Sequence, residues 1–122
     1  MGKFNSFEEI LSWQKARLFN LSIYNITGDE IFRKDFDLAR QIRRASVSIS
    51  SNIAEGYERN TDKEFIHFLY IAKASAAEVR SQLYLAFDLK YITNEVFEKL
   101  LSDIIEVSKL LSGFIKYLQA LK

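Results

Sequence analysis

The sequence predicts an all-α protein that folds as an antiparallel up-down-up-down four-helix bundle. Four long segments repeat apolar side chains at the three- and four-residue spacing of an amphipathic helix, and no segment alternates as a strand would. The chain has no proline and only four glycines, so little forces its helices to break. Short loops with capping signals separate the segments, as in a bundle of antiparallel neighbours. We predict one domain, residues 1–122, with helices at about 7–27, 36–58, 62–90 and 94–120.

The first predicted helix begins at a capping box, Ser6-Phe7-Glu8-Glu9, and ends near Gly28. It is apolar on two sides, which indicates two neighbours. Its main core stripe is predicted to be Phe7, Leu11, Leu18 and Leu21. Trp13 and Ile23 lie on nearly the opposite side. Trp13 either covers the end of the bundle or contacts another subunit.

The second predicted helix, capped by Asp35 or Asp37, carries two seams. The first has the spacing of a core stripe and consists of Leu38, Ile42, Ala45, Ile49 and Ile53. The second consists of Arg43, Val47, Ser50 and Ala54, and its small residues would let another helix come close. We therefore expect an interface between subunits on these surfaces. The predicted interface residues are Trp13, Ile23, Val47, Ser50 and Ala54.

The third and fourth predicted helices have long, continuous apolar faces. Thr61-Asp62-Lys63-Glu64 is a capping box that opens the third helix, and Thr93 or Asn94 caps the fourth. The stripe of the third helix is Phe65, Leu69, Ala72, Ala76, Val79, Leu83 and Phe87. The fourth helix has a heptad seam of Phe97, Leu101, Ile104, Ser108, Leu111, Ile115 and Leu118, and a parallel seam of Leu100, Ile104, Val107, Leu111, Phe114, Leu118 and Leu121.

Composition narrows the class of protein. The net charge of +1 gives no global attraction to nucleic acid or membrane. The absence of cysteine excludes a disulfide scaffold and a thiolate metal site. No apolar run approaches the roughly 20 residues that cross a bilayer, and the start of the chain lacks the apolar run of a secretory signal. We expect a cytoplasmic protein without a membrane partner.

No motif indicates catalysis, a metal or a cofactor. Glu64 and His67 have the Glu-x-x-His spacing of di-iron bundles, but such a site needs two histidines and the chain has one. Glu64 is also the expected capping residue. A lone histidine without cysteine makes nucleophilic catalysis improbable. We predict no catalytic residue, no metal ligand and no cofactor.

The charged residues of the middle segments allow a structural and a functional interpretation. Glu78 lies among small residues and would need Arg43 or Arg44 as a partner if it faces another helix. Asn52 and Glu55 would close the end of the bundle or join subunits. The predicted structural polar cluster is Arg43, Asn52, Glu55 and Glu78. The basic residues form either a phosphate-binding surface or a solvated helix face. They are Arg40, Arg43, Arg44, Arg59 and Lys63.

Several blocks of the chain resemble the four-helix bundle family of the proteins encoded in 23S rRNA intervening sequences. They include Trp13-Gln14-Lys15-Ala16, Gln41 to Ile49 and Asn52 to Gly56, and the resemblance extends over essentially the whole chain. One departure is Ala74, where the family commonly has glycine. The resemblance implies an antiparallel bundle that forms a homopentamer, similar also to the strongly basic accessory variability determinant of diversity-generating retroelements. It implies no enzymatic activity.

Two hypotheses of function remain open from the sequence. The first is a non-enzymatic homo-oligomer, pentameric by the resemblance, that acts as a scaffold or binds a protein partner. The second is a nucleic-acid-binding accessory protein that contacts RNA or DNA phosphates through the basic second helix. They differ in whether the arginines are interface contacts or ligand contacts.

Overall fold

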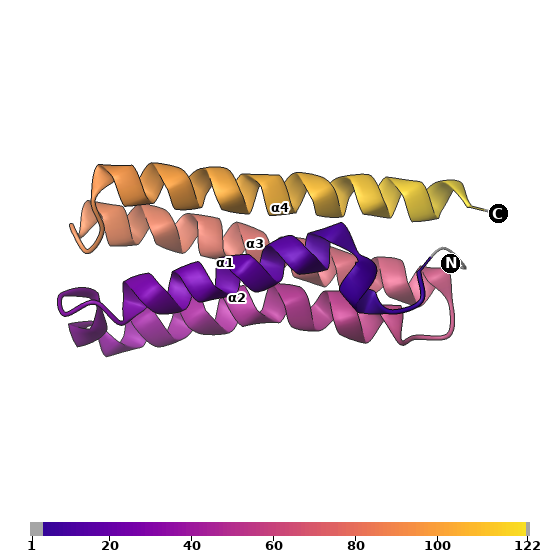
Figure 1. The fold of residues 1–122 in the computed structure, drawn as a ribbon, viewed down its shortest axis with the longest axis horizontal. Helices are drawn as coiled ribbons and strands as arrows, with labels where there is room; N and C mark the ends of the chain where they lie inside the picture. Colours follow the sequence, from indigo (N-terminus) through magenta and orange to yellow (C-terminus); the bar gives the residue numbers. More distant parts are fainter. Residues whose placement is uncertain (1–3, 122) are drawn as a thin grey trace.

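The computed structural model of the chain describes residues 4–121, and it confirms the antiparallel four-helix bundle (Figure 1). The helices are α1 (Leu11–Thr27), α2 (Phe36–Tyr57), α3 (Asp62–Asp88) and α4 (Asn94–Ala120). Two short 3₁₀ helices, η1 (Phe7–Glu9) and η2 (Phe32–Lys34), precede α1 and α2, and no strand occurs within residues 4–121. Of the predicted domain, Met1 to Lys3 and Lys122 lie outside the described residues.

Each helix packs on its neighbours in sequence, and α4 closes the bundle against α1. Both α1 and α3 pack against α2 and α4, so α1 and α3 lie on a diagonal, as the front and rear helices of Figure 1. The α1–α2 loop and the α3–α4 turn share one end of the bundle, and the α2–α3 loop lies at the other.

The predicted core seams of α2, α3 and α4 are largely those observed. All five seam residues of α2 are buried. In α3 the last buried position is Ala86 instead of Phe87, and α4 buries residues from both of its parallel seams. The helix starts follow from hydroxyl and carboxylate caps. Asp35, Thr61 and Thr93 accept hydrogen bonds from the amides of Leu38, Glu64 and Val96 at 3.1, 3.1 and 3.2 Å.

The start of α1 differs from the prediction. Ser6 forms no side-chain cap, and the Glu9 carboxylate instead accepts the amide N–H of Asn5 at 3.1 Å. Residues 7–9 form a 3₁₀ turn, after which Ile10 is extended and buried, and α1 begins only at Leu11. The extended conformation of Ile10 lets its side chain enter the core before the helix starts.

The face of α1 that enters the core also differs from the prediction. The buried residues of α1 are Ser12, Ala16, Phe19, Ile23 and Thr27. Leu11, Leu18 and Leu21 are instead 50%, 60% and 64% exposed. The leucine stripe is interrupted by Gln14, Lys15 and Asn25, whereas the buried stripe continues at helical spacing over the whole helix. Continuity of the stripe therefore decided the core face, and the three leucines point outward while Phe19 and Ile23 point into the core.

Gly56, near the end of α2, packs closely against α3. A Cβ added at Gly56 would lie 2.6 Å from the Cβ of Phe68 and 2.9 Å from Cδ1 of Phe65. Gly113 is also helical, in α4, yet an added Cβ there would meet no atom within 4 Å. Alanine substitutions at the two glycines therefore distinguish the effect of packing from the effect of helix propensity.

We expect Gly56→Ala to destabilise the protein by about 1–3 kcal/mol, because the methyl group overlaps Phe65 and Phe68. The matched control Gly113→Ala should stabilise it by about 0.5–1 kcal/mol, since alanine is the better helix former and has room. Urea denaturation followed by circular dichroism measures both. A gain in stability at Gly56 would contradict the close packing of α2 on α3.

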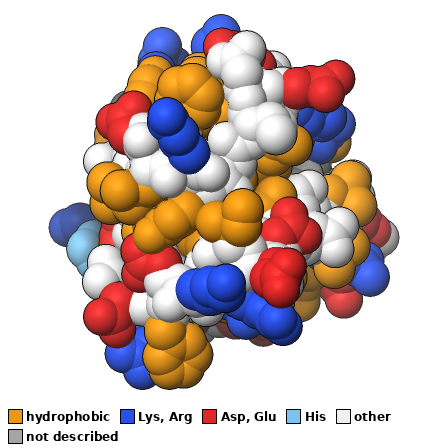
Figure 2. Space-filling view, turned by 90° about the vertical axis from the view of Figure 1, so that its left-hand side faces the viewer, with side chains coloured by type: hydrophobic (Ala, Val, Ile, Leu, Met, Phe, Trp, Pro, Cys, Tyr) orange, Lys and Arg blue, Asp and Glu red, His pale blue; other side chains and the backbone are white. Residues whose placement is uncertain are grey.

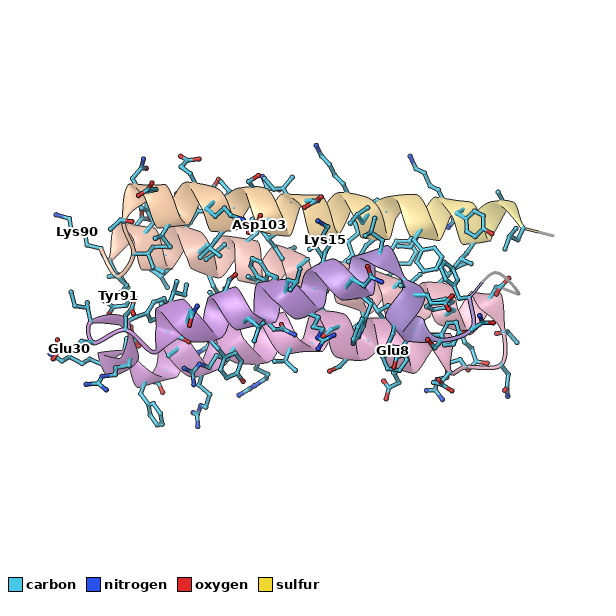
Figure 3. All side chains as sticks on the ribbon, viewed as in Figure 1. Glu8, Lys15, Glu30, Lys90, Tyr91 and Asp103 are labelled. Atoms are coloured by element: carbon cyan, nitrogen blue, oxygen red, sulfur yellow. The ribbon has the colours of Figure 1, made fainter. Side chains whose placement is uncertain are left out.

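Asp35 joins the beginning of α2 to the α3–α4 turn. One carboxylate oxygen caps α2, and the other accepts the hydroxyl of Tyr91 at 2.9 Å (Tyr91 is labelled in Figure 3). The Tyr91 ring lies 5.2 Å from that of Phe32, which is fully buried. The hydrogen bond to Asp35, then desolvation, then the charge of the same carboxylate raise the pKa of Tyr91 above its ordinary value of 10.0. Protonated Tyr91 thus helps to hold this end of the bundle together.

A raised folded-state pKa predicts alkaline sensitivity. The stability from Tyr91 is fully present below pH 10.0, the ordinary pKa, and is lost as the pH rises through the raised folded-state value. We expect Tyr91→Phe to be less stable than the wild type at neutral pH, and to lose less stability above pH 10.0. Urea denaturation at neutral pH and again above pH 10.0 measures the stability of each protein. Tyr70→Phe, at an exposed tyrosine, is the control; equal alkaline losses in wild type and Tyr91→Phe would contradict the pairing.

Candidate anion-binding site

An open groove of about 620 Å³ lies where the end of α1 meets η2 and the beginning of α2. Four of its lining residues are arginines and none is acidic. The lining residues are Tyr24, Thr27, Gly28, Arg33, Phe36, Ala39, Arg40, Arg43 and Arg44. Figure 2 faces this end of the bundle and shows basic side chains among hydrophobic and acidic ones. The groove is the place where three of the five predicted anion-contacting residues meet.

The helical repeat of α2 brings three of these arginines together. Arg40, Arg43 and Arg44 stand at i, i+3 and i+4, positions that are neighbours on one helix surface. They lie in the second and third turns of α2. Arg33 joins them from η2, because the chain reverses direction between α1 and α2. Positive charge is thus gathered from two elements.

Arg43 is held in place by α1. Its Nε donates a hydrogen bond to Thr27 Oγ1 at 2.7 Å, and Thr27 in turn donates to the Ile23 carbonyl at 2.7 Å. The Arg43 guanidinium also lies over the Tyr24 ring, 4.4 Å from its centroid. Nε is therefore occupied, whereas the two terminal amino groups of the guanidinium have no hydrogen-bond partner among residues 4–121. Arg43 is oriented and still has donors for an anion.

The other arginines of the groove have few acidic partners that would compete with a bound anion. Arg40 lies 3.9 Å from Asp37, but both side chains are mostly exposed, and such pairs contribute little. Arg33 and Arg44 are exposed and form no ion pair with any described residue. Three guanidinium groups thus face solvent beside the oriented Arg43. Phosphate oxygens are the acceptors that such a set of forked donors suits best.

The remaining two predicted contact residues lie elsewhere. Arg59 follows α2 and Lys63 is in the first turn of α3. Arg59 stacks on Phe68 with its Cζ 4.7 Å from the ring centroid, and its Nε lies 3.9 Å from Glu64. At about 1.5 Å per residue, Arg59 is roughly 24 Å along the bundle from Arg43. The structure therefore does not bring the five basic residues into one surface.

The predicted polar cluster of Arg43, Asn52, Glu55 and Glu78 is not assembled either. Arg43 binds Thr27, Glu55 is exposed, and Glu78 is exposed and accepts only from Gln82 at 3.3 Å. Asn52 donates to the carbonyl and hydroxyl oxygens of Ser48 at 2.8 and 2.9 Å, and the Ser48 hydroxyl lies 2.9 Å from that of Ser75. Among these polar groups only the Ser48–Ser75 hydrogen bond joins α2 to α3, and the four predicted residues form no salt bridge with one another.

The predicted interface residues are also dispersed. Ile23 is fully buried in the bundle core and has no surface for a second subunit. Ser50 accepts a hydrogen bond from Asn20 of α1 at 3.1 Å, so it serves a contact within the chain. Trp13 is half-buried, with its ring centroid 5.1 Å from that of Phe7. Val47 is exposed and Ala54 half-buried. Their part in an interface stays a prediction.

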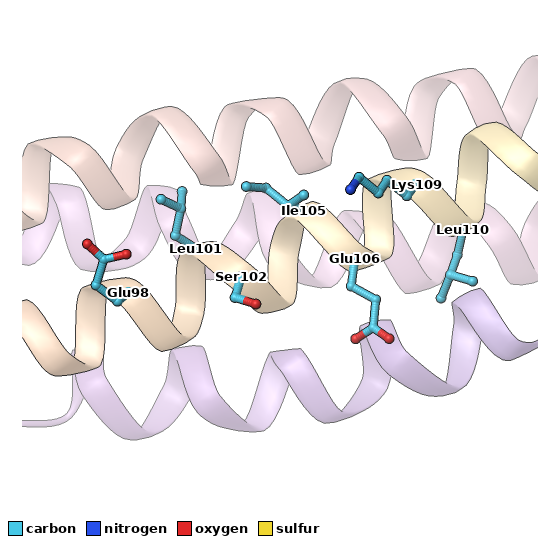
Figure 4. A pocket seen from close by; sticks show the side chains of 7 residues that line it. All are labelled: Glu98, Leu101, Ser102, Ile105, Glu106, Lys109 and Leu110. Atoms are coloured by element: carbon cyan, nitrogen blue, oxygen red, sulfur yellow. The ribbon is translucent and has the colours of Figure 1, made fainter.

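Other candidate sites offer weaker chemistry. A hollow of about 570 Å³ is lined only by residues of α4, and its side chains, including Leu101, Glu106 and Lys109, spread to different sides of the helix (Figure 4). Within residues 4–121 no three histidine, cysteine, aspartate or glutamate side chains are placed to hold a metal ion. Nor does any helix of that range have the length and apolarity to cross a membrane. The groove of arginines is the strongest candidate.

Comparison with known proteins gives a consistent picture of the fold. A family model described as 23S rRNA-intervening sequence protein matches residues 8–113. A crystal structure of a protein with unknown function from the S23 ribosomal protein family of Bacteroides thetaiotaomicron VPI-5482 is similar, with 33% identity and a TM-score of 0.81. The match covers 87% of this chain and 99% of that one. No curated protein matches.

Proposed function

This chain belongs to the 23S rRNA-intervening sequence protein family, and the similar crystal structure from Bacteroides thetaiotaomicron is that of a protein with unknown function, so we propose a function from the groove itself. The protein is a non-enzymatic, homo-oligomeric binding protein whose groove takes the phosphates of nucleic acid. The observation that carries this proposal is the group of four arginines without an acidic residue in the lining. Such a group supplies the electrostatic term that dominates nucleic-acid affinity.

The groove is better suited to binding the sugar-phosphate backbone of nucleic acid than to catalysing a reaction of a small molecule. Its basic donors come without a nucleophile, a general base or a metal-ligating set in the lining. The net charge of the chain is only +1, so the arginines stand out locally against a nearly neutral protein. Binding therefore depends on this patch and not on a general attraction.

The salt dependence of binding tests this proposal. Fluorescence anisotropy with labelled single-stranded RNA or DNA should show affinity that falls as salt rises, because phosphate contacts release counterions. Four arginines on four phosphates give a slope of log K against log salt of roughly −3 on a single strand. Affinity that does not change with salt, or no binding at low ionic strength, would refute nucleic-acid binding.

Homo-oligomerisation has its own support, which is the outward leucine stripe of α1. Leu11, Leu18 and Leu21 are each at least half-exposed, and burying one leucine side chain fully is worth about 1.5–3 kcal/mol. The diagonal helix α3 also presents an outward seam with exposed Ile71 and Leu85, small Ala74 and Ser81, and the charged Glu78 at its centre. A cyclic pentamer needs two different faces on each subunit, since odd rings use head-to-tail contacts. The two seams meet that need.

A further inference from the structure

We infer that the groove takes a single strand, with phosphates on the arginines and one base stacked on Phe36. This inference rests on the proposed binding of nucleic acid, and it names the form of nucleic acid. It comes from the most exposed large hydrophobic side chain of residues 4–121. The ring of Phe36 is 71% exposed at the first position of α2.

Phe36 stands between two open hollows. It lines the arginine groove on one side, and on the other a hollow of about 610 Å³ whose other lining residues are Ile31, Lys34, Asp35, Asp37 and Tyr91, so the basic side of Phe36 is the side of the groove. The Arg40 guanidinium lies over the Phe36 ring, 5.7 Å from its centroid. A nucleotide whose base covers this ring would therefore have its phosphate beside a guanidinium.

Tyr24 is the other aromatic residue of the groove, but it is already engaged. Arg43 lies over its ring at 4.4 Å, and Thr27 fixes the position of Arg43. Phe36 also has a cation over its ring, but the Arg40 guanidinium is farther away, at 5.7 Å, and both side chains are mostly exposed, so Phe36 is the ring that a base can cover at the smaller cost. An aromatic ring accepts the face of any base, which predicts little sequence preference.

The preference for a single strand follows from which base faces are free. In a duplex, the faces of internal bases are covered by their neighbours, and only phosphates and groove edges are accessible. A duplex could use the arginines but not the Phe36 ring. Single-stranded nucleic acid can use both, so the affinity for a single strand should depend on Phe36 and the affinity for a duplex should not.

The test measures the affinity of the full chain for three probes by fluorescence anisotropy at low salt. The probes are oligo(dT) and oligo(U) of about 12 nucleotides and a DNA duplex of the same length. Phe36→Ala removes the ring, Phe36→Trp keeps an aromatic surface, and Tyr70→Ala is the control at an exposed tyrosine of α3. Circular dichroism verifies folding of each variant. The two single-stranded probes show whether DNA or RNA is preferred.

We expect Phe36→Ala to weaken single-strand binding roughly 5- to 150-fold, the effect of losing one stacked base. Phe36→Trp and Tyr70→Ala should bind as the wild type, and duplex binding should stay within about twofold for all variants. If Phe36→Ala lost affinity equally for all probes, or lost none for single strands, the stacking inference would be overturned. The proposed function would still stand if wild-type binding is sensitive to salt. Wild-type protein that binds no probe would overturn both.

Discussion

Reversing two charges in the groove, in the double variant Arg40→Glu/Arg44→Glu, is expected to abolish most nucleic-acid binding. Both side chains are exposed, and Arg44 has no ion-pair partner among the described residues, so the substitutions leave the core intact. A hydrogen bond to a charged group is worth roughly 1.5–3 kcal/mol, and two are lost while repulsion is added. Affinity should therefore fall by more than about 100-fold. Anisotropy at low salt measures it.

A matched control separates the groove from the overall charge. Arg80→Glu/Lys116→Glu changes the net charge by the same amount at two exposed residues, in α3 and α4, that do not line the groove. This variant should keep most of the affinity. The slope of log K against log salt should become shallower by about 1.4 in the groove variant if it loses two phosphate contacts on a single strand. Equal weakening by both variants would show that binding follows net charge, and the groove would lose its role.

The long helices were predictable because their apolar stripes are unbroken. In α2 the five seam residues between positions 38 and 53 repeat at core spacing, and all five are buried. In α1 two stripes compete, and the leucines suggested the wrong face. Hydrophobicity alone could not identify the core face, because an outward leucine stripe has the same local pattern as an inward one. What distinguishes the two is the continuity from Ser12 to Thr27.

The candidate site was predictable only where it lies on one helix. Arg40, Arg43 and Arg44 share a surface by the helical repeat, which the sequence reveals. Arg33, Tyr24 and Thr27 reach the groove through the reversal of the chain between α1 and α2, which spacing does not encode. Arg59 and Lys63 were grouped with them by charge, although the length of α2 separates the two ends. Spacing along one helix is informative, and similarity of charge between elements is not.

Charging either outward seam is expected to break a head-to-tail ring into monomers. Leu18→Glu/Leu21→Glu alters the α1 seam, and Ala74→Glu/Leu85→Glu alters the α3 seam; all four positions are exposed. Each variant loses apolar burial and would have to bury charges without partners, which costs several kcal/mol per interface. Light scattering at micromolar concentration should then change from about five times the 14.2 kDa chain mass to the monomer mass, with helix content unchanged. A wild-type protein that is already monomeric would refute oligomerisation.

Mixing the two variants distinguishes a ring from a symmetric dimer. The α1 variant keeps an intact α3 seam, and the α3 variant keeps an intact α1 seam. In a head-to-tail assembly these two intact surfaces complement each other once, so the mixture should form a one-to-one heterodimer that cannot grow. In a symmetric dimer the contact uses the same patch on both chains, so a chain with that patch altered cannot form the contact. A mixture that stays monomeric would therefore exclude pairing of the α1 seam with the α3 seam.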